Sequence, residues 1–239
     1  MKTKRIIWSL FAVFYIASAI ADVGVNQWMP FNIGLDEEAI SGITIAPDGK
    51  AMYVSTKTEG VFKSTDDGKH WMKKSSGLTS LNVWPIVVNP ETPDIIYAGT
   101  FGGGVFKSED GGEHWTPTKL NHGIVFSLCI NPKSPNILYA GVAIQGVYRS
   151  VDSGESWEAI NEGLHHATTV LPLAIEQENP SIIYAGTIEG GIYQSVNAGK
   201  SWEPINDGLT STVILSLTIH PQNPNIIYAG TGGGRLFIS

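Results

Sequence analysis

The 239-residue sequence contains a single cysteine, Cys129, only three arginines, and no long apolar run after its first 21 residues. One cysteine excludes an internal disulfide, and its apolar neighbours predict a small, buried side chain. Beyond the N-terminal run, no apolar stretch is long enough to cross a bilayer as a helix. Basic residues are also scarce, which argues against nucleic-acid backbones or anionic membranes as partners.

The N-terminus has the pattern of a secretory signal peptide. Three basic residues among the first five precede an apolar run over residues 6–16, and an Ala-Ile-Ala segment ends at Ala21. We expect cleavage after Ala21, so that the mature protein, residues 22–239, has 12 basic and 22 acidic residues and a net charge of about −10. The run is too short for a membrane anchor, which predicts a soluble protein exported to the periplasm or the extracellular space.

A polar octet that ends in tryptophan occurs four times. It reads STDDGKHW, SEDGGEHW, SVDSGESW and SVNAGKSW, and its tryptophans, at positions 71, 115, 157 and 202, are 44, 42 and 45 residues apart. The tetrad Tyr-Ala-Gly-Thr and the segment Gly-Val-Phe-Lys-Ser, or close variants of them, return with the same period. Self-similarity at this spacing is typical of a repeat architecture.

Each octet has the residues of a tight hairpin turn. Its serine hydroxyl and the carboxylate two positions later can bond to nearby backbone amides, its glycine tolerates a left-handed backbone, and its tryptophan can bury a ring where the next strand begins. Because the aspartates recur at equivalent positions, we interpret them as structural rather than catalytic. The residues predicted to have this structural role are Ser64, Asp66, Gly68, Trp71, Ser108, Asp110, Gly112, Trp115, Ser150, Asp152, Gly154, Trp157, Ser195, Asn197, Gly199 and Trp202.

Each repeat is predicted to form four strands. In the second repeat we expect them at residues 83–88, 95–99, 105–108 and 114–118, separated by turns that contain proline or glycine. Four short strands per repeat, without helical periodicity, predict an all-β fold: a β-propeller of about five four-stranded blades. Residues 22–239 would then be one domain or part of a longer propeller.

The sequence begins and ends within a repeat. Residues 25–31 have the pattern of the fourth strand of a repeat whose first three strands are missing, since Trp28 precedes Trp71 by 43 residues, about one repeat length. Residues 213–239 supply only the first three strands of the last repeat. We therefore expect the N-terminal strand to complete the last blade and to close the ring. The alternative is a truncated piece of a longer array.

The octet resembles the Asp-box, Ser-x-Asp-x-Gly-x-x-Trp, of the sialidase-type (BNR) repeat propellers, with Asn197 in place of the aspartate in the fourth copy. The segment NPETPDIIYAGTFGGGVFKSEDGGEHW, residues 89–115, is similar to the branch that contains xyloglucanase-type glycoside hydrolases and photosystem II assembly-factor-like proteins. The resemblance covers nearly the whole mature chain and implies a propeller. It implies no single function, because the family includes hydrolases, sorting receptors and assembly factors.

The catalytic residues of such hydrolases are not evident. A sialidase would need an arginine triad, but the mature chain keeps only Arg149 and Arg235, and Arg149 occupies a position that holds lysine or glutamine in other repeats. A xyloglucanase-type enzyme would need two facing carboxylates, whereas Glu162 and Asp207 occupy equivalent turns of two repeats. The sequence favours a non-catalytic protein, with a small glycoside hydrolase of the xyloglucanase or sialidase type as the alternative.

No metal site or cofactor is predicted. His165 and His166 are adjacent, and on a strand they would point to opposite sides. The glycine runs precede strands instead of the helix that a phosphate-binding loop requires. We expect a monomer that binds a protein or a carbohydrate and acts as a binding or assembly scaffold.

The face opposite the octets is the expected binding surface. The octets repeat, whereas the loops between the second and third strands and between repeats vary, and loops on a rigid scaffold commonly carry binding residues. Trp84 and Phe126 share a column near the start of the innermost strands, where aromatic rings can line the mouth of a channel. The candidate binding residues are Trp84, Phe101, His122, Phe126, Glu162, His165, His166 and Glu189.

Overall fold

The structure is a computed structural model that describes residues 33–35, 39–164 and 168–239. The predicted signal peptide, the predicted strand at residues 25–31, and the candidate binding residues His165 and His166 lie outside these ranges. The described part of the chain contains nineteen strands, β1 to β19, and no helix. The predicted all-β class is therefore confirmed.

The strands follow the sequence repeat as five consecutive antiparallel meanders, which we call units one to five. In units one to four the chain runs outward through four paired strands, and unit five has three strands among the described residues. Unit one contains β1 (Ile40–Ile45), β2 (Met52–Thr56), β3 (Val61–Ser64) and β4 (Met72–Lys73). Unit two contains β5 (Val83–Val88), β6 (Ile96–Gly102), β7 (Val105–Ser108) and β8 (Thr116–Pro117). Unit three contains β9 (Gly123–Ile130), β10 (Leu138–Val142), β11 (Gly146–Ser150) and β12 (Glu158–Ala159). Unit four contains β13 (Val170–Ile175), β14 (Ile183–Thr187), β15 (Ile192–Ser195) and β16 (Glu203–Pro204), and unit five contains β17 (Ile214–Ile219), β18 (Ile227–Thr231) and β19 (Leu236–Ile238).

Strands β5 and β7 have the predicted bounds, but β6 and β8 do not. Strand β6 continues past the predicted end at Gly99 and pairs with β9, with Phe101 opposite Ile124 and Gly102 opposite Gly123. The two facing glycines allow this close backbone approach, and the pairing merges units two and three into one eight-stranded sheet. Strand β8 has only two residues, as do the equivalent outer strands of the other units that have a fourth strand among the described residues.

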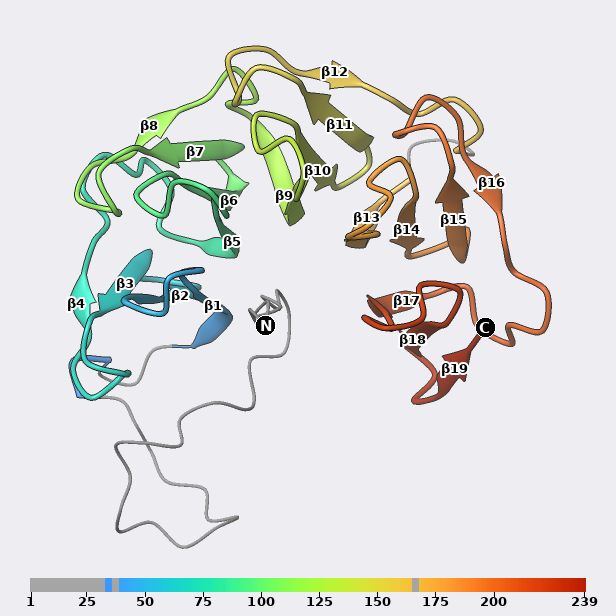
Figure 1. Cartoon of the computed structure of the whole chain (residues 1–239), viewed down its shortest axis with the longest axis horizontal. Helices are drawn as coiled ribbons and strands as arrows, with labels where there is room; N and C mark the ends of the chain where they lie inside the picture. Colours follow the sequence, from blue (N-terminus) through green and yellow to red (C-terminus); the bar gives the residue numbers. More distant parts are fainter. Residues whose placement is uncertain (1–32, 36–38, 165–167) are drawn as a thin grey trace, which may run out of the picture.

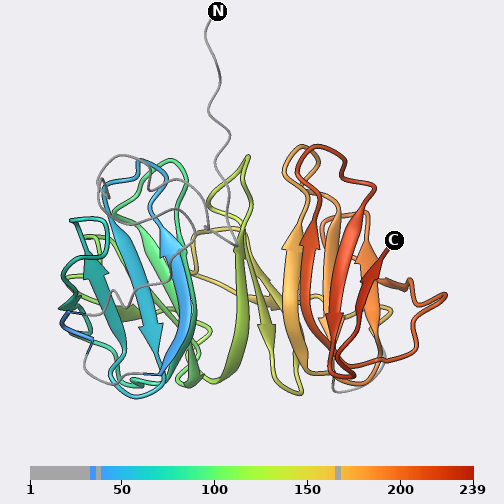
Figure 2. The same cartoon turned by 90° about the horizontal axis from the view of Figure 1, so that it is seen from below.

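The five units follow one another around an arc (Figure 1). Strands β1, β5, β9, β13 and β17 lie toward its centre and pack in this order, and the two-residue strands β4, β8, β12 and β16 lie toward its rim. Seen from the side, the strands run between two faces that carry the turns (Figure 2). Because each unit is a meander, the octets lie at one end of the strands and the turns between second and third strands lie at the other.

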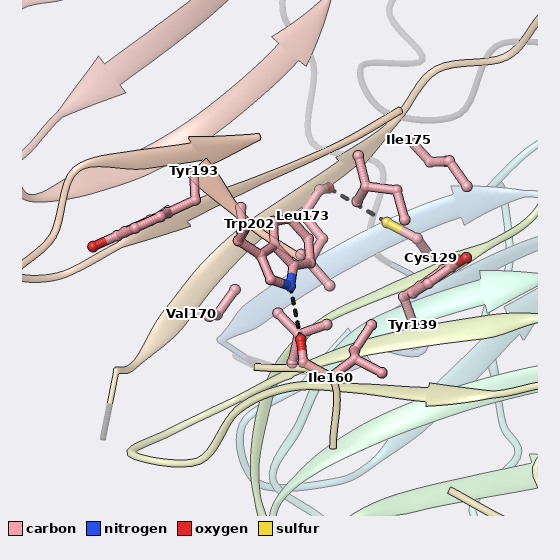
Figure 3. Packing of buried hydrophobic residues seen from close by; sticks show 11 residues of the cluster. Cys129, Tyr139, Ile160, Val170, Leu173, Ile175, Tyr193 and Trp202 are labelled. Atoms are coloured by element: carbon pink, nitrogen blue, oxygen red, sulfur yellow. Dashed lines mark hydrogen bonds between the residues drawn. The ribbon is translucent and has the colours of Figure 1, made fainter. Parts of the chain in front are cut away.

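Apolar side chains fill the space between neighbouring units. Between units three and four, Cys129 and Tyr139 pack with Leu173 and Trp202 (Figure 3). The Trp202 indole N–H donates to the Ile160 carbonyl (2.7 Å), and the Cys129 thiol donates to the Leu173 carbonyl (3.4 Å). Burial raises the pKa of Cys129 to about 12, which keeps the thiol protonated and unreactive at neutral pH.

An irregularity of the inner strands explains the glycine in the Tyr-Ala-Gly-Thr tetrad. The register of β5 against β6 shifts between Val83 and Ile86, and this shift brings Pro85 over Gly99. A Cβ atom on Gly99 would come within 2.6 Å of both Pro85 Cγ and Val125 Cγ1. In unit one the small and the larger residue are interchanged, since Gly42 replaces the proline and Ser55 replaces the glycine of the tetrad. Gly42 lies opposite Ser55, whose hydroxyl donates to the Trp84 carbonyl of unit two (2.7 Å).

We expect Gly99→Ala to destabilise the protein by about 2 kcal/mol, as is usual for an added methyl group in a packed interior. Thermal and urea unfolding measure this effect. The matched control is Gly233→Ala, since the nearest described atom, Ser211 Cβ, is 4.0 Å from the position of the new Cβ atom. Equal losses of stability in the two variants would contradict the packing of β5 on β6.

Candidate functional site

Each octet folds into the same hydrogen-bonded hairpin, which we call a clasp (residues 64–71, 108–115, 150–157 and 195–202). In the second clasp the Ser108 hydroxyl donates to the Asp110 carboxylate (2.8 Å) and accepts the Gly112 amide (2.9 Å). Asp110 also accepts the backbone amide of His114 (2.9 Å), which is the main cause of its lowered pKa. In the fourth clasp the Asn197 side-chain oxygen accepts the same two kinds of bond, from Ser195 and from the Ser201 amide (2.9 Å each).

The clasps also join neighbouring units. The residue before each clasp glycine has a positive φ of 60 to 69°. In the second, third and fourth clasps, the carbonyl group of this residue accepts hydrogen bonds from the preceding unit. The Gly111 carbonyl accepts the Tyr53 hydroxyl (3.2 Å) and the Lys63 ammonium group (3.0 Å) of unit one. We call this arrangement the tyrosine latch.

Two further latches follow along the arc. The Ser153 carbonyl accepts the Tyr97 hydroxyl (3.2 Å), and the Ala198 carbonyl accepts Tyr139 (3.5 Å) and Arg149 (3.2 Å). Arg149 thus makes the contact that Lys63 makes in unit one, and it also pairs with Glu158 on the next strand. The clasp face is therefore occupied by contacts that hold the units together.

The two cavities described next to the clasps are small. One of about 290 Å³ is lined by Asp48, Tyr53 and Lys63, and one of about 150 Å³ is lined by Lys107, Lys119 and other residues. Both lie between neighbouring units, and both fall below the usual size of a ligand pocket, about 300–1,000 Å³. We do not assign a ligand to either of them.

Two of the candidate binding residues meet on the opposite face. The rings of Trp84 and Phe126 lie edge to face, with centroids 5.3 Å apart and planes at 83°. The Trp84 indole N–H donates to the Asn82 side chain (2.9 Å), which fixes the orientation of the ring. The Lys57 ammonium group lies 5.3 Å from the centroid of the Trp84 ring, within the range of a cation–π contact.

Phe101 adjoins this pair through the backbone. Its amide donates to the carbonyl of Asn82 (2.8 Å), the residue whose side chain holds Trp84, and its side chain is 46% exposed. Phe101 lies on the extension of β6 that pairs with β9, the strand that carries Phe126. The exposed residue His122 immediately precedes β9. The structure therefore gathers four of the predicted binding residues where units two and three are joined.

The other predicted residues lie elsewhere. Glu162 is exposed, and its carbonyl accepts the Trp202 amide (2.8 Å), which places it in the turn that leads from unit three to unit four. Glu189 is exposed in the turn between β14 and β15. Glu162 and Asp207 belong to equivalent turns of successive units, and the carboxyl groups whose pKa shifts are resolved, Asp48, Asp66, Asp110 and Asp152, are all shifted downward.

Three residues of this face were not among the candidates. Lys57 belongs to one of the variable turns between second and third strands, whereas Asn82 has no distinguishing pattern in the sequence, and the fold brings both to Trp84. Ile144 is 68% exposed and has a φ of 62°, a conformation that costs a β-branched residue energy. Exposed apolar side chains in the turns of this face are Leu81, Phe101 and Ile144.

The successive meanders, their inner and outer strands and the repeated clasps define a protein of the β-propeller class. The chain belongs to the Sortilin-Vps10 family: the family model described as "Sortilin, neurotensin receptor 3" matches residues 59–185, just over half of the sequence. A comparison with curated proteins finds no match. No helix in the described residues is long and apolar enough to cross a membrane.

Solved structures share the fold at low sequence identity. An ancestral GH74 enzyme is 21% identical with a TM-score of 0.72, over 90% of this chain and 31% of its own. The GH74 xyloglucanase from Xanthomonas campestris is 18% identical with a TM-score of 0.71, over 88% of this chain and 38% of its own. YCF48 bound to a D1 peptide is 16% identical with a TM-score of 0.63, over 84% of this chain and 65% of its own. The chain thus spans about a third of the length of the GH74 enzymes.

The clasp bonds predict which substitutions of Asp110 are tolerated. Asp110→Asn should leave the melting temperature at neutral pH within about 1 °C, because Asn197 already makes these bonds. Asp110→Ala should lower it by about 2–4 °C, as expected for the loss of a turn-capping group in a protein of this size.

Acid provides the control for this comparison. The carboxylate bonds of Asp110 contribute above its ordinary pKa of 3.8 and are lost as the pH falls through the lowered value. Thermal melts at decreasing pH should therefore bring Asp110→Asn above the wild type. A lower melting temperature of Asp110→Asn at every pH would contradict this account.

The tyrosine latch predicts a loss of stability in alkali. Burial raises the pKa of Tyr53 to about 12, so its contribution is complete below about pH 10 and is lost as the pH rises through about 12. Chemical unfolding followed across this window should show a decline that is smaller in Tyr53→Phe. An unchanged slope in that variant would show that Tyr53 is not part of the latch.

Proposed function

We propose that this chain is an exported, non-catalytic Asp-box propeller that binds a protein or carbohydrate ligand on the face opposite its clasps. The observation that carries this proposal is the contact between Trp84 and Phe126, two large rings held together at the start of neighbouring inner strands. Aromatic rings fixed in this way offer apolar contact area at low entropic cost, to the face of a sugar or to an apolar side chain.

The surroundings of the pair support this proposal. Phe101 and Ile144 present exposed apolar side chains on the same face, and clustered exposed apolar residues commonly mark an interaction site. Strands β6 and β9 are hydrogen-bonded beside the pair, which makes its backbone rigid. The clasp face, in contrast, uses its carbonyl groups and its basic side chains for contacts between units.

A small glycoside hydrolase is the second candidate. The observation in its favour is the shared fold with GH74 enzymes, one of them named as a xyloglucanase. Against it stand the positions of Glu162 and Asp207 in equivalent turns of successive units. We therefore rank binding above catalysis.

The proposal also includes the type of repeat, the number of blades and the extent of the mature protein. The octets are Asp-boxes, units one to five are the five blades of one ring, and the mature protein comprises residues 22–239 as an exported monomer. Support comes from the clasp bonds, which repeat in all four octets, and from the apolar run at the N-terminus.

Two variants test which face binds. Trp84→Ala with Phe101→Ala should weaken binding more than tenfold, since aromatic anchors of an interface commonly have effects of this size. The matched control replaces Lys69, Glu113 and Glu155, which are exposed on the clasp face, by alanine. Both are secreted, checked for an N-terminus at Asp22 and for a native melting curve, and titrated with xyloglucan oligosaccharides and other glycans. Native partners are first captured with the wild-type protein, and the amount of each partner that the two variants capture is then measured.

The outcomes separate the candidates. Loss of ligand only in the clasp-face variant would reverse the assignment of the two faces. Release of reducing ends from xyloglucan that is abolished by Glu162→Gln or Asp207→Asn would replace the binding proposal with the hydrolase.

A further inference from the structure

The turn between β10 and β11 of unit three differs in its hydrogen bonds from the equivalent turns of units one and four. In those two turns the hydroxyl of Thr56 or Thr187 accepts the backbone amide three residues later, at 3.0 and 2.8 Å. Unit three has Val142 at this position, which has no hydroxyl group. The amide of Gln145 instead donates to the Val142 carbonyl (3.4 Å), so the backbone of this turn follows a different path.

The altered turn holds Ile144 in a left-handed conformation. Its φ is 62°, whereas neither Thr58 nor Glu189, at the equivalent position of units one and four, has a positive φ. This conformation is strained for an L-residue, and a β-branched side chain adds to the strain. The Ile144 amide donates to the Thr169 hydroxyl of unit four (3.1 Å), which holds the turn in place. The Ile144 side chain is exposed, so core packing does not offset the strain.

Ile144 extends a row of apolar side chains across the joined units two and three. Phe101 on β6 lies opposite Ile124 on β9, and directly opposed side chains lie on the same face of a sheet. The Ala143 amide donates to the Ile124 carbonyl (2.9 Å), which places Ile144 one residue further along. Phe101 and Ile144 are exposed, and Ile124 is half-buried. We call these three residues, Phe101, Ile124 and Ile144, the apolar row.

The polar side chains beside the apolar row already have partners. The Gln145 side-chain oxygen accepts the Tyr148 hydroxyl (3.1 Å), and the Asn82 side-chain oxygen accepts the Trp84 indole N–H (2.9 Å). The Thr169 hydroxyl accepts a backbone amide. Covering the hydroxyl groups of a sugar without hydrogen-bond partners is unfavourable, whereas an apolar side chain of a protein needs no such partner. The chemistry of the row therefore favours a protein over a carbohydrate.

Charged side chains of opposite sign lie on the two sides of the apolar row. The hairpins between second and third strands follow one another around the arc (Figure 1), and in units one to four they carry Lys57, Phe101, Ile144 and Glu189. Neither Lys57 nor Glu189 forms an ion pair with another described residue. A partner that carries an acidic residue near Lys57 and a basic residue near Glu189 would match both charges.

We propose that the apolar row binds an extended segment of a partner protein. Apolar residues of this segment contact Phe101 and Ile144, an acidic residue on one side faces Lys57, and a basic residue on the other side faces Glu189. Ile144 is the anchor of the contact, because the strained turn projects its side chain beyond the core, where a bound segment would cover it. This inference rests on the binding face proposed above and names the class of its partner.

The strain at Ile144 is measured first, without a partner. Ile144→Gly should raise the melting temperature by about 2–4 °C, because glycine adopts a positive φ without steric conflict. The matched control is Glu189→Gly, at the equivalent position without a positive φ, which should leave the melting temperature unchanged or lower it. Absence of a gain in Ile144→Gly would mean that the turn is not strained, and would overturn the assignment of Ile144 as an anchor.

A phage-displayed library of random twelve-residue peptides is the binding probe, and it is selected on the immobilised wild-type protein. The enriched sequences should share apolar residues with an acidic residue on one side and a basic residue on the other. A synthetic peptide of this kind should bind Ile144→Gly at least tenfold more weakly than the wild type, measured by fluorescence anisotropy. The variant Lys57→Glu with Glu189→Lys should prefer the same peptide with its two charges exchanged.

The other outcomes of this selection overturn the inference in distinguishable ways. No enrichment of peptides, or peptides that bind Ile144→Gly as tightly as the wild type, would remove the proposed contact. Enriched peptides without the two charges would remove the matching of charge. Binding of xyloglucan oligosaccharides alone, lost in Trp84→Ala with Phe101→Ala, would overturn the protein partner and leave the proposed function standing. Peptides lost only from the clasp-face variant would count against the proposed face itself.

Discussion

The tyrosine latch is the contact on which the arrangement of units depends. A backbone carbonyl can accept bonds from the preceding unit only if the chain reverses tightly, and the positive φ before the clasp glycine produces this reversal. The serine and aspartate bonds hold the turn in place, and the buried tyrosine supplies the donor. Each octet therefore has two roles. It forms a tight turn from which a carbonyl group projects, and this carbonyl group makes a contact between units.

The division of labour between the two faces follows from the latch. Basic side chains at Lys63 and Arg149 donate to clasp carbonyls and are not available to a ligand. The opposite face has a repeated backbone bond, from the turn glycine that leads into the third strand of units one to four to the next unit, but this bond uses no side chain, so the turns of that face can differ in composition from unit to unit. Trp84, Phe126 and Lys57 lie together there because the inner strands of units one to three are neighbours. The residues proposed to bind a ligand are therefore those that differ from one repeat to the next.

Repetition determined how much could be read from the sequence. Each position was sampled up to five times, so strands β5 and β7 and the position of the clasps followed from alignment of the copies. The column that contains Trp84 and Phe126 was visible for the same reason. The pairing of β6 with β9 was not, because it occurs once and depends on two glycines meeting across units. Asn82 also had no distinguishing pattern, and its role follows only from its hydrogen bonds to Trp84 and Phe101. Ile144 lay in a turn whose variation was visible, but its positive φ was not.

The shared sheet of units two and three has a mechanical consequence. Elsewhere in the described chain no sheet extends across two units, and side chains and single turn contacts connect them. Strands β6 and β9 instead pair directly, with Phe101 opposite Ile124 and Gly102 opposite Gly123, so backbone hydrogen bonds resist a change in the angle between units two and three. We expect the arc to bend more readily at the other junctions, which have no such ladder among the described residues. The aromatic pair spans the junction of units two and three, which this ladder stiffens.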